Sequence, residues 1–580
     1  FIFVFIYYIK EINTMAEYLS PGVYVEEYDN SPRSIEGVGT STAGFVGLAQ
    51  KGAAGGSPVL VTSFADFTKK YGNALSEYEY GEYRHLANSV EQFFTNGGTR
   101  CYIARVIPQD AKKAAATMGI LTATAANEGV WGNRIQISLS TVTRKKIQLV
   151  AETQLPITYT AKSVEGLCEG DIVVIDGEYN VISSIYDKDI TFVKPFEHEV
   201  VDKALFPERV LYLVETDVSV RYNDELEGYQ GLSFNIKSPN YIGIKMSQSN
   251  LITIEAAPMD SASNPVEQIL GEGVKEGSFV LAGGSNGSVS KVSAGTFIGE
   301  DGGPGRRTGI NAFIENQLVS MLAVPGITIP EVVVSLTAHC EKLGNRFAII
   351  DMPENMSGTD ELISYRNMID STYAAMYHPW IQVFDRAVNK AGFIPPSGAV
   401  AGVYARTDVN RGVHKAPANE TVMCTGLKVN YTSGEQDILN PEGINLIRQL
   451  PGQGIKIWGA RTAGTNSAFK YVNVRRLFIY VEESIKADTS WVVFEPNDAT
   501  LWSRVRVTIS SFLENLWRNG MLAGSTPTEG YFVEIGPTTM SDDDIKNGRL
   551  ICNIGIAAVR PAEFVIFRVT QHTAGGDSEQ

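Results

Sequence analysis

The chain has 580 residues, of which 44% are hydrophobic and 10% aromatic, and its formal net charge is −16. This length exceeds a single hydrophobic core and predicts two to four domains, and the composition excludes a disordered or fibrous protein. The acidic balance argues against a nucleic-acid-binding surface as the main function.

The cysteines and histidines give no sign of a metal site or a disulfide framework. The five cysteines are widely scattered, and the nearest two, Cys101 and Cys168, stand 67 positions apart. Because no pair has metal-ligand spacing, we expect no metal, and a reducing cytosol is the natural place of synthesis.

The first fourteen residues differ in character from the rest. Phe1 to Ile9 form an apolar run of nine residues, which is too short to span a bilayer, and Met15 then opens a polar segment. We expect residues 1–14 to be a translated upstream extension that is not native, with a short membrane anchor as the weaker alternative.

Residues 15–40 carry a lone strand and a linker. Pro21 and Gly22 set a turn, and Val23, Tyr24, Val25 and Glu26 then alternate as a strand does. The polar stretch that follows separates this strand from any local partner. It either folds back as an edge strand of its own domain or is an arm that adds a strand to another subunit.

Residues 41–135 and 263–390 predict one discontinuous α/β domain, because apolar strands alternate with amphipathic helices. The expected strands are 42–49, 101–106, 347–351 and 380–384, and the expected helices include 64–71, 86–94 and 362–371. Asp351 and Asp385 end apolar strands, where carboxylates can be catalytic. No base, nucleophile or metal set accompanies them, so we expect no catalytic residues.

Residues 136–262 change to short alternating strands with few helical stretches, which predicts an inserted β-rich domain built as a small barrel. The glycines that follow, Gly302 to Gly305 among them, mark loops. They do not form a phosphate-binding loop, because GxxxxGK[ST] does not occur in the chain. We therefore expect no cofactor.

Residues 471–520 predict two helices separated by a short apolar strand, Trp491 to Phe494. In the second helix, Asn497 or Asp498 is the expected N-cap and Gly520 the stop signal. One apolar stripe follows the helical period, with Leu501, Val505, Ile509, Phe512, Leu513 and Leu516. Arg504, Arg506 and Arg518 fall off that stripe.

The chain closes with a strand on a loose connection. In the expected arm strand of residues 560–569, Phe564 and Ile566 face one way and Val565 and Phe567 the other. The last ten residues are polar and form a loose tail. A strand without a local partner therefore stands near each end of the chain.

Several motifs, in this order, resemble contractile tail sheath proteins of myovirus-type phage tails and related injection systems. They are SPGVYVEE, TAGFVG, FTKKYG, FFTNGGTRCYIARV, RGVHKAPAN, LNPEGIN, GIKIWGART, RRLFIYVEESI and FEPND. His414 stands where the family usually has a tryptophan-like aromatic. The resemblance spans residues 18–570 except the inserted β domain.

The resemblance implies a non-enzymatic subunit with an α/β fold, a C-terminal closing domain at 391–559 and a C-terminal arm and tail at 560–580. It implies stacked six-subunit rings around an inner tail tube, with arm strands inserted into neighbouring subunits. Further partners would be baseplate and tail terminator proteins, with no direct nucleic-acid contact and no stable membrane insertion. The location would be a virion tail assembled in the host bacterial cytoplasm; the alternative is a non-phage injection system, such as an R-type bacteriocin or an extracellular particle.

The closing domain is also the expected tube-facing part. Residues 391–520 hold 14 Lys and Arg against 11 Asp and Glu, which is a positive excess in an acidic chain. The resemblance places the helix with Arg504, Arg506 and Arg518 near the tube, where solvent-exposed ion pairs would let the tube slide free. The alternative is that these arginines only solvate the helix or pair with Glu514.

Overall fold

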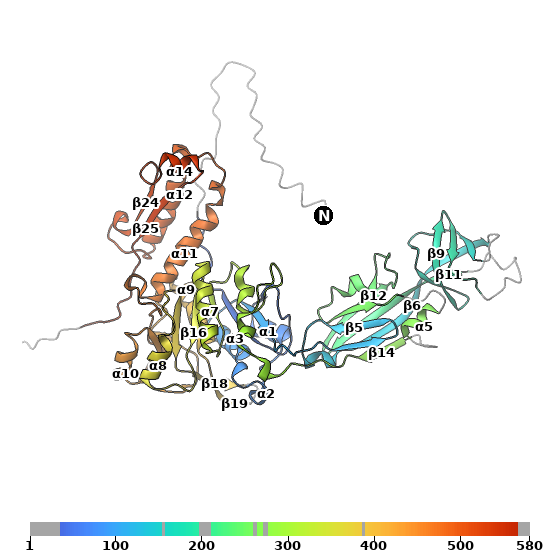
Figure 1. Cartoon of the computed structure of the whole chain (residues 1–580), viewed down its shortest axis with the longest axis horizontal. Helices are drawn as coiled ribbons and strands as arrows, with labels where there is room; N and C mark the ends of the chain where they lie inside the picture. Colours follow the sequence, from blue (N-terminus) through green and yellow to red (C-terminus); the bar gives the residue numbers. More distant parts are fainter. Residues whose placement is uncertain are drawn as a thin grey trace, which may run out of the picture.

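The computed structural model describes residues 35–152, 157–196, 210–258, 264–270, 276–385 and 389–566. It consists of a central α/β unit, a β-rich part on one side and a C-terminal lobe on the other (Figure 1). The predicted arm residues Val23, Tyr24, Val25, Glu26 and Phe567, and the predicted extension 1–14, lie outside the described residues.

A nine-stranded mixed sheet forms the centre of the α/β unit. Its inner strands are parallel and largely apolar, as expected for strands whose two faces are both covered by helices. The strands, in spatial order, are β2 (Val59–Val61), β3 (Cys101–Val106), β1 (Ala43–Leu48), β15 (Met321–Ala323), β16 (Phe347–Asp351), β17 (Ala374–His378), β22 (Ile444–Leu450), β23 (Gly454–Ile457) and β20 (Glu420–Thr421).

Helices cover both faces of this sheet, each over its own apolar core. One face carries α1 (Phe64–Tyr71), α3 (Leu86–Thr95) and α9 (Ser397–Arg411). The other face carries α6 (Ala294–Ile298), α7 (Pro330–Leu343), α8 (Thr359–Arg366) and α10 (Ser433–Leu439). The predicted α/β class is confirmed, and the sheet runs across the limit predicted between residues 390 and 391, because β20, β22 and β23 belong to it.

Smaller elements line the edges of the α/β unit. A three-stranded sheet joins β18 (Ile381–Asp385) to β19 (Lys390–Ile394) and β21 (Gly426–Leu427). The short helix α2 (Glu77–Tyr80) lies between α1 and α3. None of the helices in the described ranges combines the length and the hydropathy that crossing a bilayer requires.

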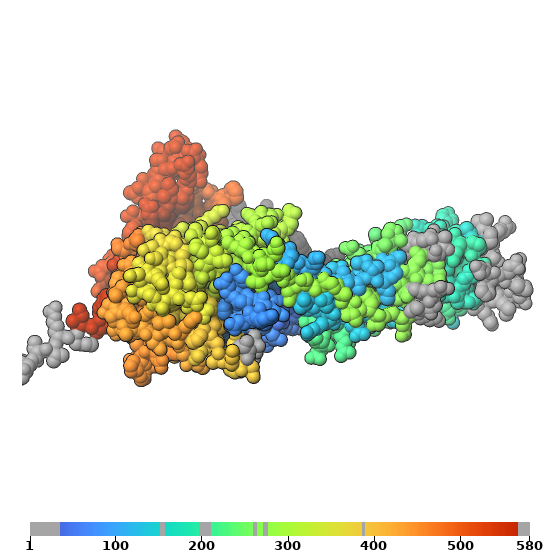
Figure 2. All heavy atoms as spheres, turned by 60° about the horizontal axis from the view of Figure 1, so that its bottom comes forward, coloured from blue at the N-terminus to red at the C-terminus, as the bar shows by residue number. Residues whose placement is uncertain are grey.

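The β-rich part projects from the α/β unit as a separate lobe (Figures 1 and 2). Six of its strands pair in a closed ring around buried apolar side chains, because β6 pairs with both β7 and β11. The ring strands are β6 (Gln136–Glu152), β7 (Thr158–Ala161), β10 (Asp189–Phe192), β9 (Glu178–Tyr186), β8 (Ile172–Ile175) and β11 (Val210–Tyr222).

Further strands extend the β-rich part beyond the ring. They are β12 (Glu225–Leu232), β14 (Glu276–Val280), β4 (Ala115–Met118), β5 (Leu121–Ala125) and β13 (Ile252–Ala256), and the helices α4 (Ile242–Met246) and α5 (Pro265–Leu270) accompany them. β4, β5 and β14 share one buried core with the strands of the predicted insertion, so this core is wider than residues 136–262.

The C-terminal lobe has its own apolar core. It contains α11 (Val472–Asp488), α12 (Ala499–Arg518), α13 (Pro527–Gly530), α14 (Asp542–Lys546) and the two-stranded sheet of β24 (Tyr531–Ile535) and β25 (Cys552–Ile556). The predicted apolar stripe of α12 is confirmed, since its six residues are all buried. Asp498 is the N-cap, because its side chain accepts a hydrogen bond from the Leu501 N–H at 2.9 Å.

The strand predicted at Trp491 to Phe494 is wrong. Residues Ser490–Val492 form a short 3₁₀ helix, and Phe494 is fully exposed with a φ of 69°. A strand needs a pairing partner. Here the run makes side-chain contacts instead, and the Arg504 guanidinium lies 4.7 Å from the centre of the Trp491 ring. Short apolar runs do not by themselves distinguish a strand from a turn.

Candidate assembly site

Glu563 fixes the point at which the C-terminal segment leaves the body. Its carboxylate accepts hydrogen bonds from Arg461 Nε and Nη2 at 2.8 Å each, from Asn440 Nδ2 at 2.7 Å and from the Tyr471 hydroxyl at 2.9 Å. Burial raises the pKa of Glu563, but these hydrogen bonds outweigh burial and leave its pKa below the ordinary value. The carboxylate therefore stays ionised and holds the segment firmly.

Residues 564–566, which follow Glu563, are largely exposed. Phe564, Val565 and Ile566 are 73%, 67% and 79% exposed and take part in no strand in the described part of the chain. Three consecutive exposed apolar side chains at the end of a folded unit are unusual for a subunit that stays monomeric. Their predicted role as an arm strand stays a prediction.

The N-terminal segment is attached to the far end of α11. The Glu36 N–H donates to Asp488 Oδ2 at 2.6 Å, and the Val38 N–H donates to Ser484 Oγ at 3.1 Å. Ile35 is buried in the core of the C-terminal lobe. Gly37 packs against the Tyr480 side chain, which would have to shift for any larger residue, because a Cβ would lie 1.9 Å from its hydroxyl oxygen.

The small sheet of the C-terminal lobe has two open edges. β24 and β25 pair only with each other in the described residues, and their inner faces pack on α12. An isolated two-stranded sheet is marginal in water, and each unpaired edge presents free N–H and C=O groups. Arg506 occupies the Ile535 carbonyl of β24, and no third strand pairs with either edge in the described residues.

The three predicted tube-facing arginines lie on exposed positions of α12, and each also has a contact within the subunit. Arg518 pairs with Glu514 at 2.5 Å, Arg506 donates to the Ile535 carbonyl and Arg504 covers Trp491. The pairing with Glu514 is the alternative that the sequence left open. Exposed pairs of this kind contribute only about 0–1 kcal/mol and can exchange partners.

A buried ion pair that the sequence did not indicate joins the C-terminal lobe to the α/β unit. Arg476 of α11 meets the Asp408 carboxylate of α9 at 2.9 and 2.6 Å, and both side chains are 3% exposed. Arg476 also donates to the Thr40 carbonyl and lies over the ring of Tyr404, whose hydroxyl contacts that of Tyr377. Burial lowers the pKa of Arg476, but Asp408 outweighs it and the pKa is raised.

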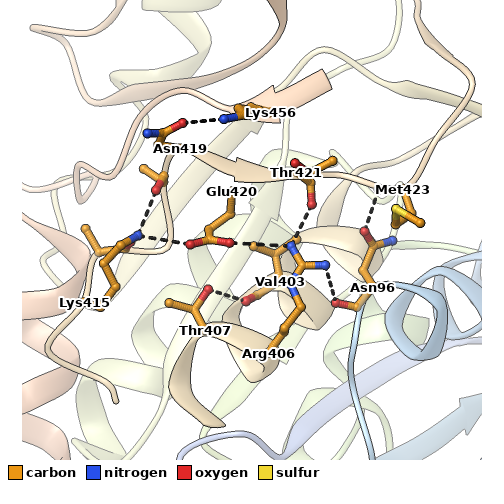
Figure 3. Close-up of polar contacts among 12 residues, drawn as sticks. Asn96, Val403, Arg406, Thr407, Lys415, Asn419, Glu420, Thr421, Met423 and Lys456 are labelled. Carbon is orange, nitrogen blue, oxygen red and sulfur yellow. Dashed lines mark hydrogen bonds and ion pairs between the residues drawn. The ribbon is translucent and has the colours of Figure 1, made fainter. Parts of the chain in front are cut away.

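The RGVHKAPAN motif folds into a polar cluster against the ends of α3 and α9 (Figure 3). Lys415 Nζ donates to the Ala416 and Ala418 carbonyls and lies 3.3 Å from Glu420. Arg406 donates to the carbonyls of Asn96 and Thr421. These contacts within the chain make the motif part of the fold.

Gly97 allows this cluster to close at the end of α3. Its φ is +110°, and a Cβ at this position would lie 2.7 Å from Arg406 Cβ. The Asn96 side chain then accepts from the Met423 N–H at 2.8 Å. The Asn96-Gly97-Gly98 turn that ends α3 thus also binds the segment that follows RGVHKAPAN.

Asp351 and Asp385, the two strand-end carboxylates, hold the fold together. Asp351 accepts from the Ser397 N–H and hydroxyl at 2.7 and 2.6 Å and from the Gly326 N–H at 3.0 Å. Burial raises the pKa of Asp351 to about 6 against these hydrogen bonds. Asp385 forms a buried ion pair with Arg84. In the described ranges, no group of three or more His, Cys, Asp or Glu side chains could hold a metal.

Two family models match adjacent parts of this chain. Residues 302–463 match the phage tail sheath protein central domain, and residues 464–572 match the phage tail sheath C-terminal domain. The tail sheath protein of Escherichia phage P2 is 25% identical over 284 residues, which cover 47% of this chain and 69% of that protein. That of Salmonella phage ViI is 30% identical over 214 residues, covering 32% and 33% of the two chains.

Solved structures share the fold over nearly the whole chain. The sheath of an extracellular contractile injection system in its contracted state has a TM-score of 0.52 and 22% identity, and the match covers 95% of this chain and 98% of that one. The sheath tail protein of Listeria innocua has a TM-score of 0.52 at 12% identity, covering 90% and 96%.

Proposed function

Because this chain belongs to the contractile tail sheath proteins, we propose that it is the structural subunit of a contractile phage tail sheath. It polymerises as stacked six-subunit rings around an inner tail tube and contracts to drive the tube through the host cell envelope. The sheath of a non-phage contractile injection system is the second candidate, because such a sheath shares this fold over nearly its whole length.

The open two-stranded sheet of β24 and β25 is the observation that carries this proposal. Each edge can receive an arm strand from a neighbouring subunit, namely residues 23–26 from one end of the chain or residues 564–567 from the other. Main-chain pairing would supply the affinity, and the arms would keep subunits connected while their globular parts rotate. The exposed apolar side chains of Phe564, Val565 and Ile566 support this role.

The other parts of the subunit take their roles from the same assembly. α12, with Arg504, Arg506 and Arg518, faces the tube, and the β-rich lobe decorates the outside. Baseplate and tail terminator proteins bind the two ends of the sleeve. The subunit needs no cofactor, acts in the virion tail and assembles in the bacterial cytoplasm.

Truncation of each arm tests this proposal. Deleting residues 15–30, or everything after Glu563, leaves a folded subunit that forms no sleeves in negative-stain electron micrographs, whereas the full chain forms them. Circular dichroism of the truncated subunits checks the fold. If either truncated chain still forms normal sleeves, strand exchange by that arm is refuted.

A further inference from the structure

Both arm roots are attached to the same helix, at its opposite ends. We define the N-terminal root as residues 35–40 and the C-terminal root as residues 559–563. At the start of α11, the Tyr471 hydroxyl binds Glu563, and Asn473 Nδ2 donates to the Val559 carbonyl at 3.1 Å. At its other end, Ser484 and Asp488 bind the N-terminal root.

The length of α11 sets the distance between these attachments. The helix has 17 residues, and a rise of 1.5 Å per residue makes it about 25 Å long. It leads from the α/β unit into the C-terminal lobe (Figure 1). An α-helix has all its interior N–H and C=O groups paired along its axis, so its length changes little under load.

Side contacts hold the helix straight between the two roots. Leu477 and Val481 are buried in the core of the C-terminal lobe, and Arg476 is tied to Asp408 and to the Thr40 carbonyl of the N-terminal root. Glu563 is in turn held by Arg461, whose side chain is only 7% exposed. Among the residues that the structure describes, neither root is hydrogen-bonded to the β-rich lobe.

We propose that α11 is a rigid strut that carries tension between the two arms of each subunit. This inference rests on the proposed sheath function and adds the path of the force within the subunit. A pull on the C-terminal arm enters at Glu563, passes along α11 and leaves through residues 36–38. The α/β unit around the nine-stranded sheet is bonded to α11 and to the C-terminal root through Asp408, Asn440 and Arg461, so it moves together with the strut. The β-rich lobe lies beside this path and can turn during contraction while the spacing of the arm roots stays constant.

A matched pair of substitutions tests the strut without touching either root. Glu482 lies at an exposed position of α11. Glu482→Gly and Glu482→Ala remove the same carboxylate, but glycine makes local opening of the helix about fivefold more frequent than alanine does. Each variant is assembled into sleeves as the full-length chain, and the guanidinium concentration that dissolves the sleeves is measured by pelleting.

The strut predicts that Glu482→Gly sleeves dissolve at a clearly lower guanidinium concentration than Glu482→Ala sleeves, whose midpoint stays near that of the parent. Asp488→Ala, which frees the N-terminal root, weakens sleeves in the same direction. Glu169→Gln in the β-rich lobe is the distant control and changes nothing. Tryptophan fluorescence of the unassembled subunits shows that all four variants are folded before assembly.

Equal midpoints for the glycine and alanine variants would overturn the strut, even if Asp488→Ala weakened the sleeves. A failure of the parent chain to form sleeves would instead refute the proposed function, and the strut with it. Sleeve formation by the parent chain therefore distinguishes a failure of the strut from a failure of the proposed function.

Discussion

The substitution Asp408→Asn removes the charge that neutralises Arg476 while keeping the shape of the side chain. Asp408 and Arg476 are almost completely buried, with N–O distances of 2.9 and 2.6 Å, and they join α9 to α11. After the substitution, the guanidinium would remain in the interior with only the Thr40 carbonyl and the Tyr404 ring beside it. Within the described part of the chain, Asp408 is the acidic side chain that forms an ion pair with Arg476.

The expected cost follows from the burial of the pair. Removing one partner of a buried ion pair costs about 3–5 kcal/mol, because the other charge is left without compensation. Replacing both partners by apolar groups of similar size is often neutral. We therefore expect Asp408→Asn to lose about 3–5 kcal/mol, and the double variant Asp408→Leu with Arg476→Met to recover most of that loss.

Guanidinium unfolding of the unassembled subunit, followed by tryptophan fluorescence, measures both effects. Trp491, Trp502 and Trp517 report on the C-terminal lobe, which the ion pair attaches to the α/β unit. A loss below about 1 kcal/mol for Asp408→Asn would show that water reaches Arg476. A double variant less stable than Asp408→Asn would show that the specific pairing, not the uncompensated charge, determines stability.

Three further changes test other parts of the fold. Burial lowers the pKa of His378 to about 4, and neither ring nitrogen has a hydrogen-bond partner in the described residues. As the pH falls, the unfolded chain therefore binds the proton first, and the free energy of unfolding decreases between pH 6.5 and 4 by up to about 3 kcal/mol. In unfolding measured across this pH range, His378→Leu should remove that part of the decrease. Phe494→Asn should raise the melting temperature of the subunit, because asparagine tolerates the positive φ that costs phenylalanine about 1–2 kcal/mol; an unchanged or lower value would contradict strain at this residue. Arg406→Met should lower stability by about 1–3 kcal/mol by leaving the Asn96 and Thr421 carbonyls without their donor, whereas Lys456→Met at the exposed rim of the same cluster is the control with a smaller effect.

Local patterns predicted most elements of the α/β unit and the C-terminal helices. Phe64–Tyr71, Cys101–Val106 and Phe347–Asp351 have the predicted bounds, because each is a continuous helical or apolar run between turn signals. The pairing of β22 with β17, and of β23 with β22, was not predictable in this way. It connects residues 444–457 to a sheet whose other strands begin at residue 43, and such long-range pairing leaves no local signal.

The contacts of the arm roots were equally hidden in the sequence. Glu563 carries no signal as a single acidic residue between Ala562 and Phe564, and its significance depends on Arg461, Asn440 and Tyr471, which are 92 to 123 positions away. The same holds for Asp488, whose partner is a backbone N–H 452 positions earlier. Hydrophobic periodicity records which face of an element is buried, but it does not record which polar group fixes the end of a segment.

The structure of the two arms cannot be predicted from the sequence or read from a single chain. Val23 to Glu26 have the alternation of a strand, yet no local partner follows them, and Phe564 to Ile566 are exposed beside their root. A strand gains most of its stability from pairing, so a segment whose partner lies in another subunit cannot complete its structure in one chain. In the proposed assembly, the arm strands of residues 23–26 and 564–567 pair with the edges of β24 and β25 in neighbouring subunits. Under that proposal, the contact between subunits, and not the single folded subunit, satisfies the pairing groups of both.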